Sequence, residues 1–215
     1  MRFCYNRRMS TLGLHGSPPK DENFFKRMFW PANQPYEADA LGQQGLWVCI
    51  AVALLSAVFA VIQGHPLLAL LLLAFYWTGG MGIREHSMAA AVIVAAGYLG
   101  SVVMAVLLGA LPGVLDVIVS ALLLANIRGT YIASSWKRRG VEPGVFPDRL
   151  NSTFTDRLID QWPARFWPGG KFLFFTIAAV YGFLFVMGAI GTMRLRAGQR
   201  PQPKEIQLQV APPSR

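Results

Sequence analysis

The sequence predicts an all-α integral membrane protein with about five transmembrane helices and short interfacial amphipathic helices. Of its 215 residues, 53% are hydrophobic and only 14% are charged, whereas soluble domains carry about a quarter charged residues. Charged residues are nearly absent from 43–127 and 172–193 and are dense elsewhere. Long apolar blocks between polar segments are typical of membrane-spanning helices, because hydrocarbon offers no partner for backbone polar groups.

The order of these blocks predicts the organisation of the chain. The expected regions are a cytoplasmic tail with an interfacial segment (1–44), a four-helix transmembrane region (45–136), a cytoplasmic interfacial loop (137–171), a fifth transmembrane helix (172–193) and a disordered basic tail (194–215). Within them the spans are expected at 45–62, 67–83, 88–111, 114–136 and 172–193. Because roughly forty polar residues precede the first span, we expect that span to act as an uncleaved signal-anchor, not as a cleaved signal peptide.

Two polar segments have the pattern of helices that lie in the headgroup layer. In 22–31, four apolar side chains share one helical face, although the same face would also suit packing against the spans. In the second segment, Thr153 and Asp156 have the spacing of a capping box, and Pro163 and Pro168 are expected to stop any long helix. The aromatic side chains expected to anchor these segments at the interface are Phe25, Phe29, Trp30, Trp162, Phe166 and Trp167.

Lysine and arginine counts predict which side of the membrane each segment occupies. The first 44 residues hold six, the turns at 63–66 and 112–113 hold none, and 128–171 holds eight. This alternation predicts a cytoplasmic N-terminus through four spans. The fifth span then places five basic residues of the last segment outside, against the rule. If the second apolar run did not cross, the basic 137–171 loop would lie outside instead, which is a worse violation, so we expect five spans.

The turn between the second and third spans contains Arg84, Glu85 and His86. One interpretation is a polar cluster at a cavity mouth that binds an ion or a headgroup. The other is a cytoplasmic turn with hydrated charges, which is favoured because the flanking spans are complete without these residues. Arg128, near the same surface, is expected to extend its side chain to the headgroups, and a pairing with Glu85 is an alternative.

The fourth span carries a line of polar residues along one broad helical face. Its members are Asp116, Ser120, Asn126, Thr130 and Ser134. Asp116 lies near the start of the helix, where a carboxylate meets the positive end of the helix dipole. A polar line of this kind faces either other helices or a water-filled path, and interhelical hydrogen bonding is the favoured interpretation. Glycines in the second and third spans, including Gly79, Gly80 and Gly97, predict close helix packing.

No motif for a cofactor or a metal is present. The histidines and the two cysteines lie in separate segments without metal-ligand spacing, and no nucleophile, zinc or phosphate-loop motif occurs. The net charge of +9 comes from basic residues that flank the apolar runs. These positions suit anionic lipid headgroups, so we expect contact with the bilayer and no binding of nucleic acid. The layout resembles that of small basic inner-membrane proteins of bacteria, and this resemblance transfers no site.

Three functions are compatible with these features. The first is a non-enzymatic scaffold or accessory subunit of a membrane complex, or a homo-oligomer, favoured because no catalytic motif is recognised. The alternative is a small transporter or channel that uses the polar line of the fourth span. The third is a lipid-modifying enzyme with Glu85 and His86 and an acid from the loop: Asp148, Asp156 or Asp160. The expected location is the bacterial inner (plasma) membrane.

Overall fold

A computed structural model describes residues 35–138 and 153–198, and all of its regular elements are helices. They are α2 (Pro35–Ile62), α3 (Pro66–Arg84), α4 (Met88–Leu107), α5 (Val114–Arg138), α6 (Phe154–Asp156), the π-helix η2 (Arg157–Gln161) and α7 (Trp162–Gly198). Within the described residues, five helices are long and apolar enough to cross a membrane, as the sequence predicted. The described part of the chain is therefore an all-α, polytopic membrane protein.

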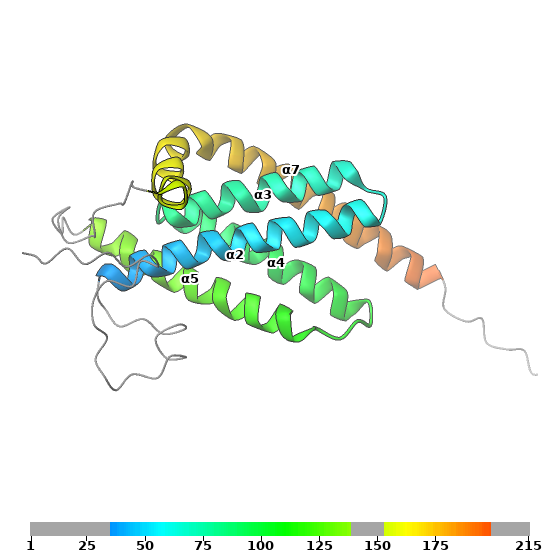
Figure 1. The fold of residues 1–215 in the computed structure, drawn as a ribbon. Coiled ribbons are helices and arrows are strands. Elements are labelled where there is room, and N and C mark those ends of the chain that lie inside the picture. Colours follow the sequence, from blue (N-terminus) through cyan, green and yellow to red (C-terminus); the bar gives the residue numbers. More distant parts are fainter. Residues whose placement is uncertain (1–34, 139–152, 199–215) are drawn as a thin grey trace, which may run out of the picture.

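The long helices run side by side, with the short ones at one end (Figure 1). The Arg84 end of the bundle holds the starts of α2, α4 and α7, the ends of α3 and α5, and the α6–η2 segment. The opposite end, here the Asp116 end, holds the α2–α3 and α4–α5 turns. α3 contacts α2, α4 and α7, and α5 contacts α2 and α4. α4 also contacts α7, but α3 packs most extensively against its neighbours and is the most buried span, so it is the central helix of the bundle.

Glycines of α3 allow this central position. A Cβ atom added at Gly80 would lie 2.8 Å from Cβ of Cys49 on α2. At Gly79 it would lie 2.3 Å from a methyl group of Val94 on α4, and at Gly82 it would lie 2.5 Å from Cβ of Ala90. Neighbouring helices approach α3 more closely than any side chain would allow, which confirms the predicted packing role of these glycines.

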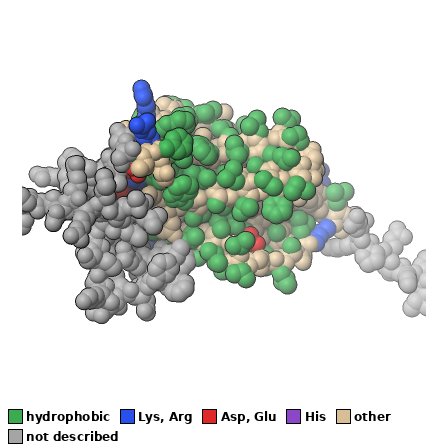
Figure 2. All heavy atoms as spheres, viewed as in Figure 1, with side chains coloured by type: hydrophobic (Ala, Val, Ile, Leu, Met, Phe, Trp, Pro, Cys, Tyr) green, Lys and Arg blue, Asp and Glu red, His purple; other side chains and the backbone are tan. Residues whose placement is uncertain are grey.

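An aromatic cluster joins α7 to α3. The ring of Phe75 lies 4.6 Å from that of Tyr181 and 5.9 Å from that of Phe174, centroid to centroid, and both partners stack on it. Phe174 and Phe75 are buried, whereas most other large side chains of α7 are exposed. On the face shown in Figure 2, hydrophobic side chains cover the helices and most of the visible Lys and Arg side chains lie toward the two ends. The exposed apolar surface suits contact with lipid.

Two helices extend beyond the predicted spans. α2 begins at Pro35, ten residues before the expected span, and proline suits a first helical turn because its missing N–H needs no partner there. α7 runs through Pro163 and Pro168, so the expectation that these prolines stop any long helix is wrong. The wide turn of η2 precedes them, with the Trp162 N–H bonded to the Arg157 carbonyl. Such a local change in hydrogen bonding accommodates proline within a helix.

The predicted helix start at Thr153 is confirmed. The Thr153 hydroxyl accepts from the Asp156 N–H at 3.1 Å, and the Asp156 carboxylate accepts from the Thr153 N–H at 3.0 Å. This capping box begins α6, which continues into η2 and α7. The α6–η2 segment is short and lies at the Arg84 end of the bundle (Figure 1).

Candidate functional site

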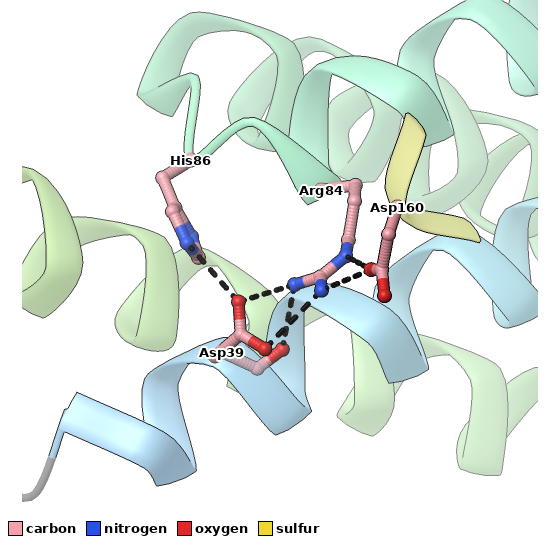
Figure 3. A network of polar contacts seen from close by, with 4 residues as sticks. All are labelled: Asp39, Arg84, His86 and Asp160. Atoms are coloured by element: carbon pink, nitrogen blue, oxygen red, sulfur yellow. Dashed lines mark hydrogen bonds and ion pairs between the residues drawn. The ribbon is translucent and has the colours of Figure 1, made fainter. Parts of the chain in front are cut away.

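The Arg84 network is the candidate site, and it consists of Asp39, Arg84, His86 and Asp160 (Figure 3). Arg84 is the last residue of α3 and is only 2% exposed. Its Nη1 lies 2.5 Å from Oδ1 of Asp39, and its Nη2 lies 2.5 Å from Oδ1 of Asp160. The expectation that the charges of this turn are hydrated is therefore wrong for Arg84, which is buried between two carboxylates.

Arg84 uses its whole donor set within the chain. Its Nε donates to Asp160 at 3.2 Å, and its Nη2 donates to both carboxylates. Its Nη1 donates to the side chain and to the backbone carbonyl of Asp39. These are five hydrogen bonds, and a guanidinium has five N–H groups in a fixed plane. Since lysine has no such fork, arginine is the residue type that can bind two acids in this way.

Apolar packing places Asp160 within reach of Arg84. The residue before it, Ile159, is buried in a cluster with Leu46 and Ile50 of α2 and Met81 of α3. Burial of such a side chain stabilises the contact by about 1.5–3 kcal/mol. Ile159 therefore holds η2 against the ends of α2 and α3, and the next side chain in the chain meets the guanidinium.

His86 has an unusual backbone conformation. Its φ is +57°, whereas the other residues of positive φ in the described chain are Gly64 and Gly109. All three follow the end of a helix. In each case the residue's N–H bonds the carbonyl three residues earlier, and the next N–H bonds the carbonyl five residues before it. Glycine is the usual residue there, and another L-residue costs about 1–2 kcal/mol in this conformation.

The ring of His86 points toward Asp39 (Figure 3). Its Nε2 lies 3.9 Å from Oδ1 of Asp39, the oxygen that also accepts from Arg84. The side chain is 15% exposed, against 2% for Arg84. His86 thus borders the network from its more accessible side, where a charge on the ring would act on Asp39 directly.

Comparisons of the chain with protein-family models, with curated proteins and with solved structures found no match.

The polar line of α5 lies against other helices along much of its length. Asn126 and Thr130 are 1% and 2% exposed, and Ser120 and Ser134 are half-buried. The Ser134 hydroxyl donates to the Tyr131 carbonyl of its own helix at 2.9 Å. The burial of these side chains places the polar line against other helices, and interhelical hydrogen bonding by these four residues stays a prediction.

Asp116 lies at the start of α5 and binds two donors. Its Oδ1 accepts from the Tyr98 hydroxyl of α4 at 3.0 Å, and its Oδ2 accepts from the Gly113 N–H at 2.8 Å. The second bond occupies one of the N–H groups that helix formation leaves without a partner. Asp116 therefore caps its helix, a hydrogen bond that the dipole argument from sequence did not specify, and also ties α5 to α4.

Asn126 is the exception within this line. Both its Oδ1 and its Nδ2 are buried and have no hydrogen-bond partner. A Cβ atom added at Gly45 of α2 would lie 3.0 Å from this carboxamide and 2.6 Å from a methyl group of Ile83. The carboxamide is therefore enclosed where α2, α3 and α5 meet. Burial of an amide without a partner costs about 1–3 kcal/mol.

The other predicted site residues are separate from the Arg84 network or border it. Glu85 is the C-cap of α3, and Nη1 of Arg128 is buried. Their pairing stays a prediction. Trp162 and Phe166 are exposed, as an interfacial role requires, but Trp167 packs on Phe174, with ring centroids 5.8 Å apart. The predicted anchors at 25, 29 and 30, and the candidate acid at 148, lie outside the described residues.

The acids that the lipid-enzyme hypothesis needs have other partners. Asp156 belongs to the capping box of α6, and Asp160 binds Arg84. In the described part of the chain, no group of three His, Cys, Asp or Glu residues is placed to hold a metal ion. Sequence reasoning missed Asp39, because residues 35–44 were assigned to the polar tail. Pro35 followed by leucines at 41 and 46 was the available signal for an earlier helix start.

Proposed function

We propose that the protein is a non-enzymatic membrane component, either a scaffold or an accessory subunit of a membrane complex. The observation that carries this proposal is the use of all five N–H groups of Arg84 within the chain. A guanidinium that binds a substrate or a headgroup needs donors that face outward. Here the same donors join α2, α3 and η2, so this buried cation stabilises the fold.

The surface of α7 supports a role in assembly. In the most apolar 18-residue stretch of α7, 11% of the residues are buried, whereas in the corresponding stretch of α3 the buried share is 50%. A Cβ atom added at Gly188 or Gly191, which lie three residues apart on one face of the helix, would meet nothing within 4 Å. Small residues on a membrane helix allow a second helix to approach closely. We propose that this face of α7 contacts another helix, either of a second copy or of a larger complex.

The mass of the protein in lipid nanodiscs tests this role. We expect the purified assembly to exceed one chain, and Gly188→Leu to reduce the assembly because a bulky side chain blocks close approach. Ala51→Leu adds the same side chain on an exposed position of α2 and serves as the matched control. A monomer without partners, or equal loss of assembly in both variants, would refute the proposal.

The orientation is proposed from the charges. In the sequence, six basic residues lie in 1–44, up to the start of α2, and eight lie in 128–171, from the end of α5 to the start of α7. These helix ends belong to the Arg84 end, so we propose that this end faces the cytoplasm of a bacterial inner membrane. The odd number of spans then places the C-terminus outside. A C-terminal reporter that is active only outside the cytoplasm should be active, and an inactive but intact fusion would contradict this orientation.

One observation favours transport as a second candidate function. The buried carboxamide of Asn126 has no hydrogen-bond partner, and buried polar groups inside membranes often lie on paths for water or substrate. Cysteine-accessibility scanning along α5 separates the two functions. Labelling through the middle of the helix supports transport, whereas labelling at its ends alone supports the accessory role.

A further inference from the structure

His86 combines two features that its structural position does not require. Gly64 and Gly109 hold the same place after α2 and α4, so glycine would satisfy the backbone at 86 without strain. The imidazole instead occupies that place, 3.9 Å from the carboxylate that Asp39 shares with Arg84. The strained conformation thus brings a titratable ring to the edge of the buried network.

The network has an excess of negative charge while His86 is neutral. Asp39 of α2 and Asp160 of η2 face a single cation, Arg84 of α3. Other described charges lie at this end: Glu85 in the same turn, Arg128 of α5, Asp156 and Arg157 of the α6–η2 segment, and Arg165 and Lys171 of α7, whereas α4 has none. The excess of one negative charge is that of Asp39, Arg84 and Asp160 taken by themselves.

We propose that protonation of His86 strengthens the Arg84 network, so that attachment of the α6–η2 segment to the bundle depends on pH. Histidine changes its charge between pH 5 and 8. A protonated ring would balance the excess negative charge and would form an ion pair with Asp39 at the observed 3.9 Å. Because Asp39 and Asp160 bind one guanidinium, support for Asp39 also holds Arg84 in place for Asp160.

The sign of the effect follows from this charge balance. Near pH 8 the neutral ring forms no ion pair with Asp39, and within the Arg84 network one guanidinium faces two carboxylates. Near pH 5.5 the added proton favours the attached segment. The α6–η2 segment should therefore separate from the bundle more often at pH 8 than at pH 5.5. This inference is independent of the proposed accessory role, because a monomer can show it equally well.

Thiol labelling of Ile159→Cys measures attachment, because Ile159 is 3% exposed and is covered by α2 and α3. The background variant carries Cys4→Ser and Cys49→Ala. Gln161→Cys, at an exposed position, reports the intrinsic reaction rate at each pH. We expect the labelling rate of Ile159→Cys, divided by that of Gln161→Cys, to be at least threefold lower at pH 5.5 than at pH 8.

Substitution of His86 tests whether its ring causes the pH dependence of the labelling ratio. His86→Asn and His86→Gly both suit the positive φ, and each should abolish the pH dependence of the ratio. His65→Asn removes an exposed histidine at the opposite end and should preserve it. The proposal would be overturned if this ratio did not change with pH in the cysteine variants that retain His86. It would also be overturned if the ratio changed equally with pH after His86 is replaced.

Discussion

At the residue scale, Arg84 is a buried charge whose stability depends on well-formed hydrogen bonds. Transfer of a guanidinium and two carboxylates out of water is costly, and the mutual attraction offsets that cost only when the hydrogen bonds are well formed. Arg84 makes five of them. The sequence pointed to Arg84 as a charge beside the membrane and to Asp160 as one of three candidate acids of the loop, but it did not indicate Asp39. The two partners lie 45 and 76 positions away from Arg84 along the chain.

Asn126 shows the opposite condition, a buried polar group whose hydrogen bonds are unmade. Asn126→Leu keeps the branched shape and removes both polar atoms. We expect it to raise the free energy of unfolding by about 1 kcal/mol, because the penalty of an unsatisfied amide is removed. Thermal unfolding in detergent measures this change, with Leu123→Ala, at a buried position of the same helix, as a check that the assay detects a loss of apolar contact. A lower stability of the Leu variant would show that the carboxamide binds something in the native state.

At the element scale, the sequence predicted the apolar spans well and their ends poorly. Apolar length fixes the part of a helix that lies in hydrocarbon, whereas the polar extensions depend on contacts made in the folded bundle. α2 gains its first turns where Asp39 binds Arg84, and η2 carries the matching Asp160. The sequence did predict the start of α6 at Thr153, because the capping box of Thr153 and Asp156 depends only on residues close together in the chain.

Close helix packing leads to a prediction for Gly82. Gly82→Ala places a Cβ atom 2.4 Å from the Trp167 ring and 2.5 Å from Cβ of Ala90. The helices must move apart, and overpacking of this kind costs about 1–3 kcal/mol. We expect lower thermal stability of the Ala variant in detergent. Gly182→Ala, which adds a methyl group to open space on α7, should be neutral or slightly stabilising, and equal loss in both variants would contradict this packing.

At the scale of the whole molecule, the bundle is assembled around α3. Hydropathy shows which segments cross the membrane but not which helices are neighbours, because every apolar face suits lipid and protein alike. The contacts of α3 with α2, α4 and α7 depend on its glycines and on the aromatic cluster of Phe75. The Arg84 network adds a polar tie among α2, α3 and η2 at one end, and together these contacts make α3 the organising element.

The most direct test of this account compares Arg84→Met with the triple variant Asp39→Asn, Arg84→Met, Asp160→Asn in thermal unfolding. The single change leaves two carboxylates buried without their cation, and we expect it to cost about 3–5 kcal/mol. The triple change removes those charges as well, so it should recover a substantial part of the loss. A triple variant as unstable as Arg84→Met, or less stable, would contradict the claim that a buried ionic tie holds these three segments together.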